Sequence, residues 1–150
     1  MDKIDRRMLQ ILQKNGRISI SDLSKELALS RPSVSERLHR LQERGVIEEF
    51  SARISLKELG REILLIVQVS GLKVSPQEFE TMVRQKEDII ECHRVTGHVS
   101  YFLKAAVSNM DRMRLLIDSL MPYATINTST VLTSPVMYRY AIPQDNSFDN

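Results

Sequence analysis

The stretch ISISDLSKELALSRPSVSERLHRLQERG, residues 18–45, decides the fold of the first third of the chain. It holds two helix-forming segments, each introduced by a serine whose hydroxyl can cap the helix and by an apolar residue just before that serine. Ser19 and Ser30 are the expected caps, and only about three residues, 28–30, separate the two helices. So short a turn holds two helices at a steep angle, which predicts a helix-turn-helix.

A further helix is expected to precede this pair. Apolar residues recur at helical spacing between positions 4 and 12, and they end before Asn15 and Gly16. Asparagine and glycine both tolerate the left-handed backbone conformation that ends helices. We therefore expect the first helix to stop at this pair.

The residues after Gly45 change character again. Gly45 closes the second helix of the pair, and residues 46–50 and 52–54 alternate enough between apolar and polar side chains to predict two short strands, a wing. The predicted first domain is therefore a winged helix-turn-helix over residues 1–50, followed by a linker or strand at 51–61.

The helix that begins after Ser30 is the element that would enter the major groove of DNA. An apolar stripe of Val34, Leu38 and Leu41 faces inward, so the polar side chains point outward. Arginine can pair with guanine and glutamate can accept from cytosine, whereas other basic side chains and helix N-termini suit phosphates. The residues expected to read bases are Arg31, Ser33, Glu36 and Arg40, and those expected at phosphates are Arg37, His39, Arg44, Ser19, Ser21 and Ser30.

The charge distribution agrees with a DNA-facing surface in the first third. The net charge is only +2, but residues 1–61 hold 13 Lys and Arg against 9 Asp and Glu, whereas the remaining 89 residues hold 8 against 10. The charges alone fit a solvated helix face equally well, and some helix-turn-helix domains bind protein. Two capped helices, a tight turn and a terminal glycine within about 30 residues favour DNA binding.

The hydrophobic periodicity changes from Glu62 onward and predicts a second domain over residues 62–140. Strands and capped helices alternate there in the order β-α-β-β-α-β, which is that of a ferredoxin-like fold with both helices on one face of an open sheet. The chain as a whole is thus of the α+β class, with residues 141–150 as a disordered polar tail. The expected strands cover residues 63–69, 89–95, 99–107 and about 126–133. One expected helix begins after Ser75, and the other carries Met113, Leu116, Ile117 and Leu120 and ends at Pro122.

The face of the predicted sheet that carries no helices is expected to pack against another surface. Leu64, Ile66, Ile90 and Phe102 lie on phases that could make this face apolar. Pairing with a second subunit is the simplest way to bury it, so we expect a homodimer.

No pattern of an enzyme or of a metal or cofactor site is found. The five glycines are too scattered for a phosphate-binding loop. Cys92 and His93 are adjacent on a predicted strand and point to opposite faces, so they cannot readily coordinate one metal ion together with His98. One cysteine excludes an intrachain disulfide, and there is no secretory signal or apolar run of about 20 residues. We expect a cytoplasmic protein without catalytic activity and without contact to membranes.

With both halves in place, the chain resembles the Lrp/AsnC (leucine-responsive, or feast/famine) family of bacterial and archaeal transcription regulators. The resemblance covers nearly all of residues 1–140. It rests on residues 5–12, Asn15-Gly16-Arg17, residues 27–34, Arg37-Leu38, Arg40-Leu41, Gly45-Val46-Ile47, residues 91–97 and residues 101–104.

The resemblance implies a dimer, often assembled into an octamer, that binds and can bend DNA in the nucleoid. It also implies that an amino acid lodges between C-terminal domains of neighbouring dimers. The effector residues that follow from it are Thr96, Gly97, His98, Ser100, Tyr101, Thr128, Ser129 and Thr130.

The sequence departs from the family pattern in one place. Family members commonly have Gly-Asp-x-Asp before the tyrosine, where this chain has Gly97-His98-Val99-Ser100. An acidic group would suit the amino group of a ligand.

The leading prediction is a sequence-specific regulator modulated by an amino acid or related metabolite. The alternatives are an effector-independent architectural DNA-binding protein and a metabolite-binding or enzymatic module that uses its helices to oligomerise.

Overall fold

The chain folds around two separate hydrophobic cores. The structure, a computed structural model, describes residues 1–141, and these form two compact units. Among the described residues, the first unit comprises Met1–Arg53 with residues 136–141, and the second comprises Ile54–Pro135. The expected tail lies, apart from residue 141, outside the described residues. Among those described, no helix is long and apolar enough to cross a membrane.

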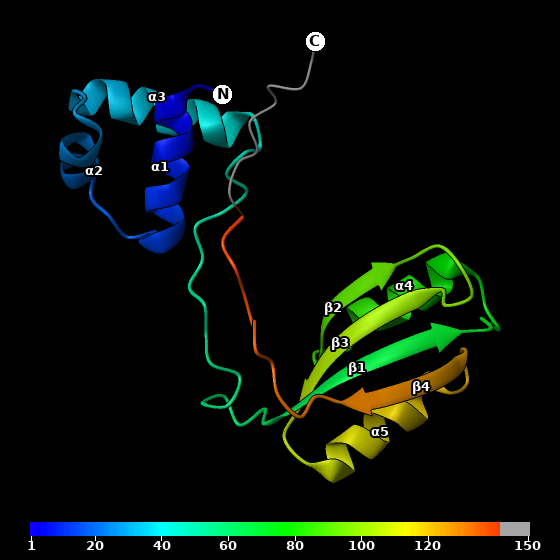
Figure 1. The fold of residues 1–150 in the computed structure, drawn as a ribbon. Coiled ribbons are helices and arrows are strands. Elements are labelled where there is room, and N and C mark those ends of the chain that lie inside the picture. Colours follow the sequence, from blue (N-terminus) through cyan, green and yellow to red (C-terminus); the bar gives the residue numbers. More distant parts are fainter. Residues whose placement is uncertain (142–150) are drawn as a thin grey trace. The chain divides into compact units, whose positions relative to one another are not determined.

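Three helices build the first unit: α1 (Lys3–Lys14), α2 (Ile20–Leu27) and α3 (Arg31–Glu43) (Figure 1). The predicted caps are confirmed, because the Ser19 side chain accepts from the Asp22 amide and the Ser30 side chain from the Ser33 amide. Apolar side chains at helical spacing meet at the centre of the unit. The core residues are Met8, Leu9, Leu12, Leu23, Val34 and Leu41.

The ends of these helices differ in part from the prediction. Asn15 ends α1 with a φ of −144°, and Gly16 does not take a positive φ either. The Asn15 side chain instead accepts a hydrogen bond from the Arg17 amide at 3.1 Å, which turns the chain without a left-handed residue. Left-handed conformations occur at Gly45, as predicted, and at Ala28 in the tight turn, where φ is 52°.

The two predicted wing strands are not formed. Residues 46–54 contain no strand. The amides of Val46 and Ile47 donate to the Leu41 carbonyl oxygen at 2.9 and 3.1 Å, so these residues complete the end of α3. Alternation of side chains can indicate a strand, but a strand also needs backbone hydrogen bonds to a neighbouring segment. Within residues 1–141, the backbone of residues 48–54 makes no such bond to another segment.

The segment that follows the second unit returns to the first. The Gln13 side-chain amide donates to the Ala141 carbonyl oxygen at 2.9 Å, and the Arg53 guanidinium lies 5.1 Å from the centre of the Tyr138 ring. The first unit therefore contains both the start and the end of the described chain.

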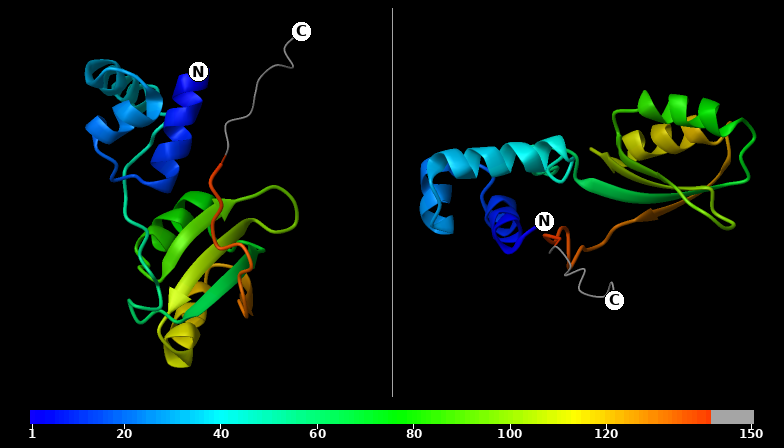
Figure 2. Two further views of the ribbon diagram at one scale, coloured as in Figure 1. Left: turned by 60° about the vertical axis from the view of Figure 1, so that its left-hand side comes forward. Right: turned by 90° about the horizontal axis from the view of Figure 1, so that it is seen from above.

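The second unit has the predicted ferredoxin-like fold. Its four strands pair antiparallel in the order β2-β3-β1-β4, and both helices cover one face of the sheet (Figure 2). Leu65, Val67 and Val69 face those helices and are fully buried. The elements are β1 (Ile63–Ser70), α4 (Pro76–Arg84), β2 (Ile89–Arg94), β3 (Tyr101–Val107), α5 (Met110–Leu120) and β4 (Thr125–Thr130).

The other face of the sheet carries three of the four expected apolar side chains, Leu64, Ile66 and Phe102, whereas Ile90 falls where the pairing of β2 with β3 is irregular. In the register of β1 and β3, Ile66 pairs with Lys104 and Gln68 with Phe102, and Leu64 follows the same alternation. The helix-free side of the sheet thus combines apolar and charged groups. A second subunit on this face remains a prediction.

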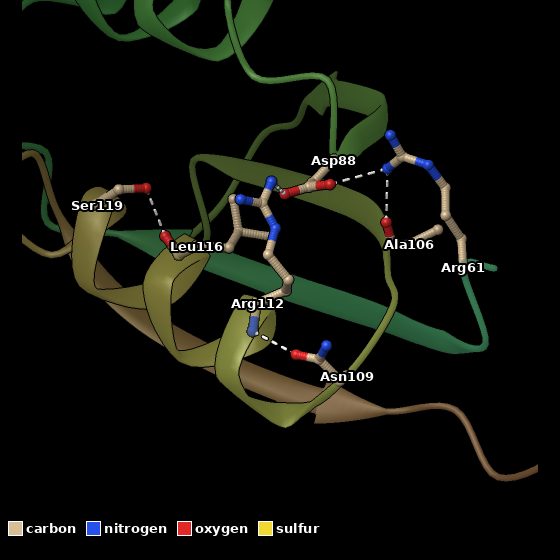
Figure 3. A network of polar contacts seen from close by, with 7 residues as sticks. All are labelled: Arg61, Asp88, Ala106, Asn109, Arg112, Leu116 and Ser119. Atoms are coloured by element: carbon tan, nitrogen blue, oxygen red, sulfur yellow. Dashed lines mark hydrogen bonds and ion pairs between the residues drawn. The ribbon is translucent and has the colours of Figure 1, made fainter.

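Asp88 joins three segments of the second unit (Figure 3). Its Oδ1 accepts from Arg61 at 2.9 Å, and its Oδ2 accepts from Arg112 at 2.8 Å. Arg61 also donates to the Ala106 carbonyl oxygen at 2.8 Å, and the Asn109 side chain caps α5 by accepting from the Arg112 amide. The segment before β1, the connection between α4 and β2, and the first turn of α5 are therefore held together by one carboxylate.

Candidate DNA-binding surface and effector site

Polar contacts fix the turn between α2 and α3. The Arg31 guanidinium donates to the Ser21 hydroxyl at 2.8 Å and so links the N-terminal ends of the two helices. Ser30 and Ser33 lie with their hydroxyl oxygens 2.9 Å apart. At the start of α2, the Ser19 hydroxyl lowers the pKa of Asp22 by donating to its carboxylate at 2.7 Å. The predicted contact residues of both helix starts are thus gathered on one edge of the unit.

The outward face of α3 is basic and largely unpaired. Val34 and Leu41 are buried in the core, which leaves Glu36, Arg40 and Arg44 exposed. Within residues 1–141, the side chains of Arg40 and Arg44 have no hydrogen bond or ion pair to another group, whereas His39 lies 3.0 Å from Glu43. This face can therefore offer guanidinium groups to an external acceptor.

Arg37 is placed differently from the other arginines of α3. Its Nη1 lies 2.6 Å from Asp2 Oδ2 and 2.8 Å from Asp5 Oδ1, and both carboxylates raise the pKa of Arg37. The amide of Asp5, followed by Arg37, holds the pKa of Asp2 below its ordinary value. The sequence did not identify Asp2 and Asp5 as partners of Arg37. Their spacing indicates a helix cap, but no local pattern indicates a partner more than 30 residues away.

The first group of predicted effector residues lies at the turn between β2 and β3. Thr96, Gly97 and His98 are exposed, and Gly97 has a φ of 107° that favours glycine. Ser100 is fixed by its backbone, since its amide donates to the Val69 carbonyl oxygen at 2.7 Å and its carbonyl oxygen accepts from Val95 at 2.9 Å.

Tyr101 belongs to the core and not to the surface around this turn. Its side chain is 1% exposed, and its ring centre lies 4.9 Å from that of Phe79 on α4. The hydroxyl donates to Glu80 at 2.8 Å. Burial, followed by this carboxylate, raises the pKa of Tyr101 to about 12. The phenol therefore stays protonated and bound to α4 at neutral pH.

The second group of predicted effector residues lies on β4. Thr128 pairs with Val67, and its hydroxyl oxygen is buried with no hydrogen-bond partner in the described part of the chain, whereas Ser129 and Thr130 are exposed. The strand order places β4 at one edge of the sheet and β2 at the other. One chain therefore does not bring the turn at 96–98 and the β4 residues together.

Cys92 and His93 point away from each other, as predicted. Cys92 is exposed at the surface but lines a small cavity with Glu80 and Tyr101 on the helix side of the sheet, and partial desolvation there raises the pKa of its thiol. His93 lies 3.3 Å from Glu91. Among the residues that the structure describes, no group of three or more His, Cys, Asp or Glu could hold a metal ion.

A capped helix-turn-helix with a basic exposed helix is typical of a DNA-binding regulator, and the ferredoxin-like domain joined to it is of a kind that binds small ligands. Comparison with known families agrees: residues 1–48 match the winged helix-turn-helix DNA-binding family, and residues 64–141 match the Lrp/AsnC ligand binding domain. The leucine-responsive regulatory protein of Escherichia coli strain K12 is 38% identical over 120 residues, which cover 78% of this chain and 73% of the relative. The chain belongs to the Lrp/AsnC family of transcription regulators.

Solved structures of related regulators are similar to this chain over more than nine-tenths of its length. LrpC of B. subtilis has a TM-score of 0.87 at 26% identity, with 92% of this chain and 99% of that chain covered. The feast or famine regulatory protein of M. tuberculosis, complexed with L-methionine, has a TM-score of 0.86 at 28% identity, with 95% and 99% covered. A transcriptional regulator from Neisseria meningitidis in complex with L-methionine has a TM-score of 0.85 at 26% identity, with 97% of each chain covered. The predicted fold class and family are confirmed.

Proposed function

We propose that this regulator recognises specific DNA sequences through α3 and that an amino acid bound by its second domain modulates this recognition. The observation that carries the proposal is the exposed face of α3, where the Arg40 and Arg44 guanidinium groups have no partner within residues 1–141. Unpaired guanidinium groups on a helix that fits the major groove can donate to guanine or to phosphate.

The assignments differ between residues because their present partners differ. Arg31 is exposed, and its guanidinium donates to the neutral Ser21 hydroxyl. The Asp22 carboxylate is close enough to interact with its charge but forms no ion pair with it within residues 1–141, so Arg31 can exchange the Ser21 bond for a base. Arg37 is occupied by two carboxylates, so we assign it no phosphate contact. The proposed base-reading residues are Arg31, Ser33, Glu36 and Arg40, and the proposed phosphate contacts are His39, Arg44, Ser19, Ser21 and Ser30.

The Arg40→Ala variant tests the DNA-binding proposal. A duplex is first selected from a random library by binding to the full-length protein, and a shuffled duplex of the same composition is prepared. Loss of one base contact should cost about 1–3 kcal/mol, or about 5-fold to 150-fold, on the selected duplex and much less on the shuffled one. Arg114→Ala on α5 removes an exposed arginine of the second unit and is the matched control. Equal losses on both duplexes would contradict base reading by Arg40.

The effector site is proposed to lie between chains. The turn at 96–98 joins β2 to β3, and β1 separates β3 from the β4 residues Thr128, Ser129 and Thr130. Ser100 lies beside β1, where its amide bonds to Val69. We infer that a site that uses both the turn and β4 needs a second chain. Two of the similar regulators were solved with L-methionine. We infer a homodimer that assembles further, with an octamer as the expected size, and action in the cytoplasm at the nucleoid. We expect Tyr101 to support this site from the core, with its hydroxyl remaining on Glu80.

A panel of L-amino acids, each with its D-enantiomer as control, tests the effector proposal by thermal shift of the full-length protein. A ligand present at 100 times its dissociation constant stabilises the folded state by about 2.7 kcal/mol. We expect one L-amino acid, with L-methionine and L-leucine as first probes, to raise the melting temperature. A flat panel at millimolar concentration would contradict the proposal and favour the architectural alternative, which needs no effector.

A further inference from the structure

Arg37 links α3 to α1 through ion pairs with Asp2 and Asp5. It lies in the middle of α3 with 22% of its side chain exposed, and its Nη1 contacts Asp2 Oδ2 at 2.6 Å and Asp5 Oδ1 at 2.8 Å. The Asp5 side chain is only 10% exposed. Ion pairs that are partly withdrawn from water are less screened by salt than fully exposed pairs.

The two carboxylates are themselves held in place. Asp2 Oδ1 accepts from the Asp5 amide at 2.8 Å, and Asp5 Oδ2 accepts from the Asp2 amide at 3.2 Å, which is a capping box at the start of α1. Each carboxylate thus uses one oxygen to cap α1 and the other to bind Arg37. Because the cap fixes both side chains, α1 presents a preformed receptor for one guanidinium of α3.

This receptor controls how α3 is rotated about its own axis. Arg40 follows Arg37 by three residues and Ser33 precedes it by four, so all three lie on adjacent parts of the helix surface. A rotation of about 20° would move a side-chain tip roughly 5–6 Å from the helix axis by about 2 Å. Hydrogen bonds to base edges tolerate only a few tenths of an ångström, so such a rotation would break them.

We propose that Arg37, together with Asp2 and Asp5, is a positioning residue that sets the orientation of α3 and thereby the discrimination between specific and other DNA. The inference rests on the proposed DNA-binding function and gives these residues no contact with DNA. A phosphate contact and a positioning role predict different results. Loss of a phosphate contact weakens binding to every duplex and lowers the salt dependence by about one released ion. Loss of a positioning contact lowers only the preference for the selected duplex.

The test measures affinity for the selected and shuffled duplexes, at several salt concentrations, with Asp2→Asn, Asp5→Asn and Arg37→Gln. Asparagine is itself a good helix cap, so Asp2→Asn keeps α1 capped and decides the question if another variant fails to fold. Asp118→Asn on α5, which pairs with Arg114 in the second unit, is the matched control. We expect the ratio of the two affinities to fall roughly tenfold in each variant but not in the control, with shuffled-duplex affinity and salt dependence unchanged.

The outcomes separate this inference from the function on which it rests. A wild-type protein that binds both duplexes equally would refute the proposed function itself. A wild-type protein that discriminates, together with variants that discriminate equally well, would overturn the positioning role. A parallel loss on both duplexes with a smaller salt dependence in Arg37→Gln would also overturn it, because it would make Arg37 a phosphate contact.

Discussion

Replacing Leu23 by alanine should unfold the DNA-binding unit at a temperature at which the second unit stays folded. The Leu23 side chain is 1% exposed and belongs to the core of the first unit, which is separate from that of the second. Truncation of a buried leucine to alanine costs about 2–5 kcal/mol, because transfer free energy is lost and a cavity remains. We take about 3 kcal/mol for this site.

That loss is large for a unit of this size. A domain of roughly 50 residues is stabilised by only about 3–8 kcal/mol. One kcal/mol shifts the melting temperature of a small domain by about 4–8 °C, so Leu23→Ala should lower the first transition by about 12–24 °C. Calorimetry of the full-length protein at fixed concentration should show this shift while the second transition stays in place.

Leu65→Ala is the matched control, since Leu65 is fully buried in the second core and should shift only the second transition. If both transitions move together in either variant, or if one cooperative transition is seen throughout, the two cores do not unfold independently. An unshifted first transition in Leu23→Ala would refute the burial of Leu23.

Three further substitutions test particular contacts. Tyr101→Phe should lower the stability of the second unit by about 1–2 kcal/mol through loss of the bond to Glu80. Since the pKa of Tyr101 is raised to about 12, the wild type should lose stability between about pH 10 and pH 12, and a variant that loses it equally would contradict this origin. Ala28→Gly should raise the stability of the first unit by about 0.5–1 kcal/mol, because Ala28 has a φ of 52°; destabilisation in urea titration would speak against a strained turn. Asp88→Asn should cost the second unit about 1–3 kcal/mol by weakening its contacts with Arg61 and Arg112, and an unchanged midpoint of chemical unfolding would show that these contacts contribute little.

Local sequence signals predicted most of the fold. The caps at Ser19, Ser30 and Ser75 and the apolar spacing located the helices, because a cap and the face it starts are separated by only a few residues. The alternation of β1 and β3 also gave the correct faces of the sheet. The prediction of two wing strands was wrong because alternation at 46–54 carries no information about whether a pairing partner exists.

The candidate site was predictable only in part. The outward face of α3 follows from the helical repeat, and the exposure of Arg40 follows with it. The occupation of Arg37 depends on Asp2 and Asp5, and such pairing over a long sequence separation leaves no local pattern. The inward direction of Tyr101 could have been read from its alternation with Leu103, but the family resemblance favoured a place at the effector site.

The most direct test of the account is the ratio of affinities of the full-length protein for the selected and the shuffled duplex at near-physiological salt. Regulators that read base edges bind their sites about a thousandfold or more tighter than other DNA. We predict a ratio of that order, which depends on Arg40 and is altered by the effector. A ratio near one, with affinity that falls steeply as salt rises, would contradict sequence recognition by α3 and would make the protein an architectural DNA-binding protein.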